Sequence, residues 1–317
     1  EGLEQAFPEQ NIDIIEIAQD GDRVLFETSS PRHPPAYFIL IDKSRVAVIG
    51  SSRPWIDPED IGHTELVYYP ARDGLQIPGL LTYPAGYDKE TDGPVPTIIL
   101  PHGGPWARDF NEWDSSGWPQ FLSSRGWAVL KPQYRGSTDW GRELWFAGDK
   151  EWGQKMQDDK DDGAQWLVDQ GIADPDRLAI FGYSYGGFAA MAATVREDGP
   201  FQCAIAGAGV SNLTLFNRLW SSNPIQRIVQ GNTLAGMDPS KNTSKANIPI
   251  LVYHGDRDVR VPIEEGRGFY NAVRNKVNAK FVEIDDMPHS LPWWPEHHRE
   301  SLSAIENWLK SDNCNNF

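Results

Sequence analysis

The chain has 317 residues, of which 39% are hydrophobic, and its formal net charge is −16. A chain of this length can bury one large core and still carry a smaller appendage. The excess of acidic residues argues against nucleic acid or an anionic membrane surface as a partner. No run approaches the roughly 20 apolar residues of a membrane span. The composition therefore predicts a soluble globular protein.

The amino-terminal part contains four short strand-like runs separated by turn residues, at 12–17, 23–27, 36–41 and 45–49. Together they have the size of one β-propeller blade. We expect a β-strand appendage over residues 1–60, either as the remnant of a propeller in a longer protein or as a small unit that packs in its own right. The chain begins at Glu1 without a signal-like segment. We therefore expect a fragment, with a cytoplasmic location as the first choice and a secreted or periplasmic origin as the alternative.

Residues 61–317 alternate strands with helices, which predicts an α/β domain with a doubly wound, mostly parallel sheet. The expected strands are 66–69, 80–83, 97–100, 128–131, 178–181, 204–206, 250–253 and 280–284. The expected helices are 118–124, 159–170, 187–195, 264–274 and 298–310.

The fifth of these strands leads into Gly182-Tyr183-Ser184-Tyr185-Gly186, and a run of small residues follows. A Gly-x-Ser-x-Gly pattern between a strand and a helix is the nucleophile elbow of the α/β-hydrolase fold. The glycines leave room for neighbouring backbone around a strained turn. The pattern predicts Ser184 as a catalytic nucleophile.

A triad in this fold needs an acid and then a histidine later in the chain. The strand at 250–253 is followed by Asp256 and Asp258, and spacing alone does not separate the two. His289 follows the last strand, where the general base belongs. His254 ends a strand and is interpreted as structural.

Acyl transfer also needs donors for an oxyanion, which come from the backbone amide after the nucleophile and from the loop after an early strand. The first donor is the amide of Tyr185. The strand at 97–100 runs into a His-Gly-Gly turn, so the second is expected from Gly103 or Gly104.

Two further features have simple interpretations. The acidic run at 158–162 is expected to form a solvated helix face. Cys203 and Cys314 are too few for a zinc site, and a disulfide between them is not expected. We expect no metal and no cofactor.

The chain resembles the catalytic domain of the prolyl oligopeptidase family of serine peptidases, and within it the acylaminoacyl-peptidase-like branch. The resemblance covers roughly residues 65–311. The matching motifs are His102-Gly103-Gly104-Pro105, Gln133-Tyr134-Arg135-Gly136-Ser137 with Gly141, 182–187, His254-Gly255 with Asp258 and Val261-Pro262, and His289. The resemblance implies that Asp258 is the triad acid and that Gly104 and Tyr185 supply the oxyanion amides. In some members of the family, a tyrosine at the position of His102 places its hydroxyl in the oxyanion hole. This chain has histidine there, so it has no tyrosine hydroxyl at that position.

Substrate choice depends on residues that the motifs do not cover. Segment 212–236 lies where such hydrolases insert pocket elements, and Phe216 and Trp220 are expected either to line a pocket or to form its core. Arg218 or Arg227 is a candidate for a substrate carbonyl, with a surface ion pair as the alternative. Trp106 is expected either to wall the cleft or to pack in the core.

Three functions follow from these residues. The first is a serine peptidase that cleaves small peptides or acylated amino acids through an acyl-enzyme. The second is a carboxylesterase that acts on small esters. The third is a binding module without catalysis, which the occupied triad positions disfavour.

Overall fold

The computed structural model describes residues 2–220, 224, 233–315 and 317. The chain divides into two compact units. The first unit comprises Glu1–Glu65, Thr82–Asp88 and Phe110–Gly126, and the second comprises Leu66–Leu81, Lys89–Asp109 and Trp127–Phe317. The domain boundary that we expect after residue 60 stays a prediction.

The first unit contains an antiparallel sheet of four strands in the order β1-β2-β3-β4. The strands are β1 (Asn11–Ile17), β2 (Arg23–Ser29), β3 (Ala36–Ile41) and β4 (Arg45–Ser51). The fully buried ring of Phe26 lies 5.5 Å from Phe38 and 5.7 Å from Phe7, which follows helix α1 (Gly2–Ala6). The four predicted strands are confirmed, and their meander resembles a single propeller blade.

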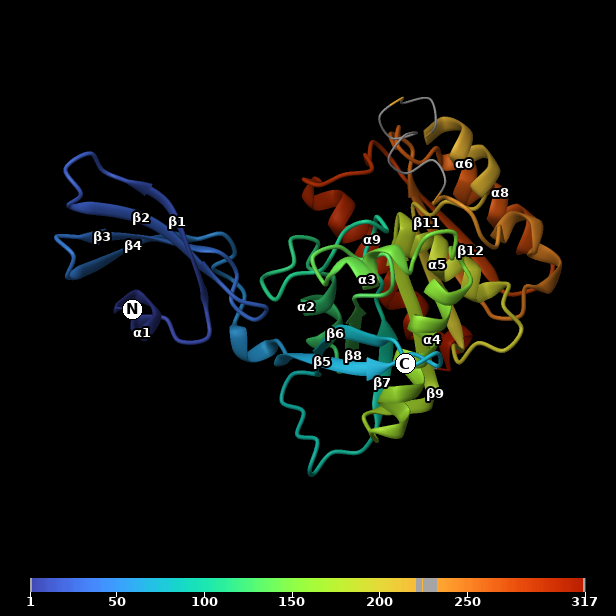
Figure 1. Ribbon diagram of the computed structural model, residues 1–317, viewed down its shortest axis with the longest axis horizontal. Coiled ribbons are helices and arrows are strands. Elements are labelled where there is room, and N and C mark those ends of the chain that lie inside the picture. The colour runs from blue at the N-terminus through green and yellow to red at the C-terminus, as the bar shows by residue number, and fades with distance from the viewer. Residues whose placement is uncertain (1, 221–223, 225–232, 316) are drawn as a thin grey trace. The chain divides into compact units, whose positions relative to one another are not determined.

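The second sheet has eight strands in the order β12-β11-β10-β9-β7-β8-β6-β5 (Figure 1). Its strands are β5 (Thr64–Pro70), β6 (Gln76–Thr82), β7 (Val95–Ile99), β8 (Ala128–Pro132), β9 (Ala173–Tyr183), β10 (Cys203–Gly207), β11 (Ile250–Gly255) and β12 (Ala279–Ile284). Parallel pairing joins β8 to β7, β7 to β9, and β9 through β10 and β11 to β12. The predicted α/β-hydrolase fold with a mostly parallel sheet is confirmed.

The order of the strands reverses between β7 and β9, which are neighbours in the sheet. The chain leaves β7 toward β8 on one side and leaves β9 toward β10 on the other. The loops after these two strands therefore diverge, and a crevice forms outside their carboxyl ends. The loop at 102–106 and Ser184 follow these two strands.

Helices cover both faces of this sheet, and Figure 1 shows α4 and α5 in front of the strands with α9 behind them. Among the described residues, the helices of this unit are α3 (Arg142–Phe146), α4 (Lys155–Asp169), α5 (Tyr185–Thr194), α6 (Leu213–Trp220), α8 (Ile263–Val273) and α9 (Pro295–Leu309). Helix α2 (Trp118–Ser123) belongs to the first unit. Helix α9 begins before the predicted residue 298, because proline is well suited to the first helical position. Within the described residues, every helix is too short or too polar to traverse a bilayer.

The expectation of unpaired cysteines is wrong, because Cys203 and Cys314 form a disulfide with a Cα–Cα distance of 5.2 Å. Cys203 begins β10, and Cys314 ends a 3₁₀ turn after α9. The polar tail folds back onto the sheet, where Cys314 is fully buried and Asn315 donates a hydrogen bond to the carbonyl oxygen of Asp176. The polarity of the tail did not indicate this path.

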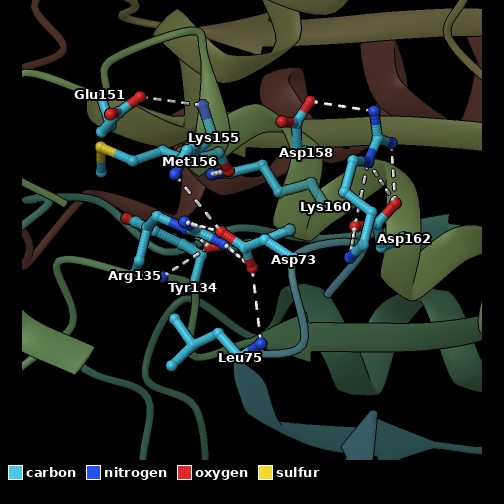
Figure 2. A network of polar contacts seen from close by, with 12 residues as sticks. Asp73, Leu75, Tyr134, Arg135, Glu151, Lys155, Met156, Asp158, Lys160 and Asp162 are labelled. Carbon is cyan, nitrogen blue, oxygen red and sulfur yellow. Dashed lines mark hydrogen bonds and ion pairs between the residues drawn. The ribbon is translucent and has the colours of Figure 1, made fainter. Parts of the chain in front are cut away.

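The expectation of a solvated face at 158–162 is also wrong. Asp159, Lys160 and Asp161 on α4 are buried, with Asp159 and Lys160 fully inaccessible. The guanidinium of Arg135 offsets the buried charge, because its Nη2 lies 2.7 Å from Asp159 Oδ1 and its Nη1 lies 2.9 Å from Asp73 Oδ2. Figure 2 shows Arg135 beside Asp73, with the labelled residues of α4 above them. A buried carboxylate is tolerated where such a bidentate partner meets it.

Candidate active site

Ser184 lies at the junction of β9 and α5, with backbone angles of φ 59° and ψ −114°. This strained turn lifts the side chain out of the sheet. A Cβ at Gly186 would collide with the carbonyl oxygen of Pro101, which lies in the loop after β7. The glycine therefore lets the loop and the serine turn approach each other closely.

The loops after β11 and β12 bring an acid and a base to this serine. His289 Nε2 lies 3.0 Å from Ser184 Oγ, and His289 Nδ1 lies 2.6 Å from Asp258 Oδ2. The carboxylate of Asp258 accepts the hydrogen of Nδ1, so the lone pair of Nε2 faces the serine hydroxyl. Asp256 is exposed, whereas Asp258 is buried against His289. Of the two aspartates, Asp258 is the one in contact with the histidine.

Asp258 accepts hydrogen bonds from the backbone as well as from His289. Its Oδ1 accepts hydrogen bonds from the backbone amides of Arg260 (2.9 Å) and Val261 (2.8 Å). Burial by itself would raise the pKa of Asp258, but hydrogen bonds from His254 and His289 outweigh it and hold the pKa well below its usual range. The carboxylate is therefore ionised at neutral pH.

His254, a structural residue by its place at the end of β11, also contacts Asp258. This fully buried residue donates from Nε2 to the carbonyl oxygen of Val261 at 2.8 Å. The same nitrogen lies 3.3 Å from Asp258 Oδ2. Its position at the end of β11, just before the loop of the acid, was the available signal.

The loop after β7 lies beside the serine on the other side of the crevice. A Cβ on Gly103 would lie 3.5 Å from Ser184 Cβ, and Gly104 has φ +130°, which disfavours residues with a side chain. Tyr185 is the first residue of α5, so its amide is among those without a partner inside the helix. The structure thus brings both predicted oxyanion donors to the neighbourhood of Ser184.

Tyr134 supports this loop, a role that its sequence motif alone does not assign. Its hydroxyl donates to the carbonyl oxygen of His102 at 2.8 Å, and its ring stacks on His102 with centroids 4.4 Å apart. His102 Nε2 lies 2.9 Å from Ser137 Oγ. Both partners come from the Gln-Tyr-Arg-Gly-Ser motif, whose presence in the sequence could have indicated the contact.

An apolar cluster lies next to the serine turn. Trp106 and Phe216, each expected either to contact substrate or to pack in a core, lie around Trp152 with ring centroids 6.0 and 6.4 Å from it. Phe216 is buried in this cluster, and Trp106 is partly buried against it. Trp152 in turn contacts Tyr185 at 4.7 Å. Two other predictions cannot be placed, since Arg227 and the side chains of Trp220 and Arg218 lie outside the described residues.

The comparisons with known proteins agree with this geometry. The prolyl oligopeptidase family model matches residues 113–312. Dipeptidyl aminopeptidase BIII of Pseudoxanthomonas mexicana is 31% identical over 91% of this chain, which spans 44% of that enzyme. The chain therefore spans less than half the length of this relative.

Solved structures show the same fold. A puromycin-hydrolyzing peptidase of Mycobacterium tuberculosis has a TM-score of 0.74 at 22% identity, with 92% of this chain and 45% of that chain covered. The acylaminoacyl peptidase of Pyrococcus horikoshii has a TM-score of 0.75 at 18% identity, with 94% and 49% covered. Since the family model covers well over half of the sequence, the chain belongs to the prolyl oligopeptidase family of serine peptidases.

Proposed function

We propose that this chain is the catalytic part of a serine peptidase that hydrolyses peptide or acyl-amino-acid bonds. The observation that carries the proposal is the series of short contacts from Ser184 Oγ through the imidazole of His289 to the carboxylate of Asp258. Such a series activates a hydroxyl for attack on a carbonyl carbon. Membership in the prolyl oligopeptidase family supports the choice of an amide substrate.

In the proposed mechanism, Ser184 attacks the scissile carbonyl while His289 takes the proton of its hydroxyl. Asp258 holds the imidazole in the required tautomer and stabilises its positive charge. The amides of Gly104 and Tyr185 donate to the developing oxyanion. His289 then protonates the leaving amine, and water releases the acyl group from Ser184 by the same steps in reverse.

The cluster around Trp152 supports a substrate with an apolar side chain on the acyl side. Trp106 and Phe216 pack against Trp152, and Trp152 contacts Tyr185, whose amide would bind the reacting carbonyl oxygen. A similar relative is named a dipeptidyl aminopeptidase and a similar structure is titled a puromycin-hydrolyzing peptidase. Short peptides and aminoacyl amides are therefore the substrates to test first.

The test is a rate comparison on dipeptidyl anilides, acyl-amino-acid anilides and a short-chain acyl ester. The Ser184→Ala protein serves as the blank, and Ser244→Ala, at an exposed serine, serves as the matched control. Amide cleavage that is lost in Ser184→Ala and kept in Ser244→Ala is expected. Ester cleavage without amide cleavage would replace the proposal with a carboxylesterase, and activity in Ser184→Ala would refute both.

We also propose that the chain folds in an oxidising compartment, in place of the cytoplasmic location first expected. The support is the buried disulfide between Cys203 and Cys314, because such bonds form mainly in secreted, periplasmic or lumenal proteins. Mass spectrometry of alkylated protein from its native source tests this. Two alkylated cysteines without prior reduction would contradict it.

A further inference from the structure

A lysine with no part in the proposed mechanism is buried beneath the candidate site. Lys160 on α4 is fully inaccessible, and its ammonium donates to the carbonyl oxygen of Met156 at 2.6 Å. The same ammonium lies 3.6 Å from the ring centroid of Tyr134 and 5.2 Å from that of Tyr185. Figure 2 shows Lys160 beside Met156 and Tyr134. An ammonium is costly to bury, and the faces of two tyrosines compensate only part of its lost hydration.

The two tyrosines connect this charge to both halves of the oxyanion site. The rings of Tyr134 and Tyr185 stack with centroids 5.2 Å apart. Tyr134 donates its hydroxyl hydrogen to the carbonyl oxygen of His102, immediately before Gly103 and Gly104. Tyr185 carries the amide that follows the nucleophile. An ammonium against both rings therefore restrains the two backbone segments that would face the oxyanion.

Several charged groups set the protonation of Lys160. Burial lowers the pKa of Lys160 to about 7. On its own helix Asp159 and Asp161 oppose this shift, while Arg135 and Arg196 reinforce it. Burial raises the pKa of both Tyr134 and Tyr185, so both remain neutral phenols at any pH of interest.

We propose that Lys160 is a positioning residue of the oxyanion site. Its ammonium holds the stacked rings of Tyr134 and Tyr185, and through them the loop of Gly104 and the amide of Tyr185. This inference rests on the proposed function. Because the oxyanion exists only during the reaction, loss of the ammonium lowers kcat and leaves KM nearly unchanged.

The test compares Lys160→Met and Lys160→Arg with wild type in the full 317-residue chain. Lys155→Met is the matched control, because Lys155 lies on the same helix, is half exposed and pairs with Asp73 at 3.5 Å. For Lys160→Met we expect kcat to fall by about 10-fold. Loss of a direct oxyanion donor lowers kcat by about 100-fold or more, so the effect of Lys160 should be the smaller one. Affinity for a peptide trifluoromethyl ketone, which forms an oxyanion, should fall in parallel, whereas affinity for the product peptide should not.

The pH profile separates positioning by charge from simple packing. In wild type, kcat should decline on the alkaline side as Lys160 loses its proton, and this decline should be absent in Lys160→Met and Lys160→Arg. Equal kcat and equal alkaline limbs in wild type and Lys160→Met would overturn the inference. If the Lys160→Met protein does not fold, the wild-type protein alone provides the test. A wild-type pH profile of kcat without an alkaline decline would then overturn the inference.

The failure of this inference can be told apart from the failure of the proposed function. A fluorophosphonate probe that does not label Ser184 in the wild-type chain, together with no hydrolysis of any substrate, would refute the proposed function. Labelling and hydrolysis that are unchanged in Lys160→Met would refute only the role of Lys160.

Discussion

Replacing Cys203 and Cys314 together with alanine should lower the free energy of unfolding by several kcal/mol. The two residues are 111 positions apart in the sequence. The chain-entropy relation for a loop of this length gives about 16 cal/mol/K, or about 4.8 kcal/mol at 25 °C. For 317 residues, an unfolding entropy of about 2.1 cal/mol/K per residue amounts to about 0.67 kcal/mol/K. The transition midpoint should therefore fall by about 7 °C.

Differential scanning calorimetry of the wild type and the double variant, each with and without a thiol reductant, measures this effect. Wild type should lose a similar number of degrees on reduction, and the double variant should not respond to the reductant. That second comparison separates the cross-link from the packing of the two sulfur atoms. Because the disulfide is buried, the wild-type protein is first incubated with the reductant in denaturant and then refolded. An unchanged transition midpoint after this treatment would refute the reasoning. Two free thiols in the unreduced protein would also refute it.

Three further predictions address the site and the buried lysine. Asp258→Asn should lower kcat by about 10⁴-fold with the fold intact, because an amide can hold His289 in the wrong tautomer; steady-state kinetics and circular dichroism check this. Gly186→Ala should lower the free energy of unfolding by about 2 kcal/mol or more and remove most activity, because its Cβ meets backbone. Gly199→Ala is the control, since a Cβ there faces open space and should change neither quantity. Urea titrations and rate assays measure both effects. Since burial lowers the pKa of Lys160 to about 7, the unfolded chain binds more protons than the folded chain above that pH. Wild type should then gain stability relative to Lys160→Met between pH 7 and about 10 in urea titrations, and a constant difference would contradict this.

Much of the candidate site could be predicted because its residues follow strands. Ser184 comes directly after a strand and His289 lies on the loop after another, and both strands are readable from their apolar residues. Parallel strands place their carboxyl ends at one edge of the sheet. The choice between Asp256 and Asp258 could not be made from spacing. It depends on which carboxylate is buried and meets the amides of Arg260 and Val261.

The wrong expectations concern side chains whose surroundings come from distant segments. Three consecutive charged residues at 159–161 indicate solvent by composition, yet Arg135 from the loop after β8 neutralises Asp159 inside the protein. The disulfide joins Cys203 to a polar tail whose path is set by the end of α9. Neither local propensity nor local charge contains this information.

The close approach of Gly186 to the Pro101 carbonyl has a consequence for how this protein can change. The serine turn and the loop after β7 share backbone contacts, so they behave mechanically as one piece. Drift in substrate scope, in nature or in a laboratory selection, then has to proceed through side chains such as Trp106 and Phe216. Libraries that vary the partly buried Trp106 should therefore contain more folded members than libraries that vary the turn glycines, where an added Cβ meets backbone, or the buried Phe216, where a smaller side chain leaves a cavity.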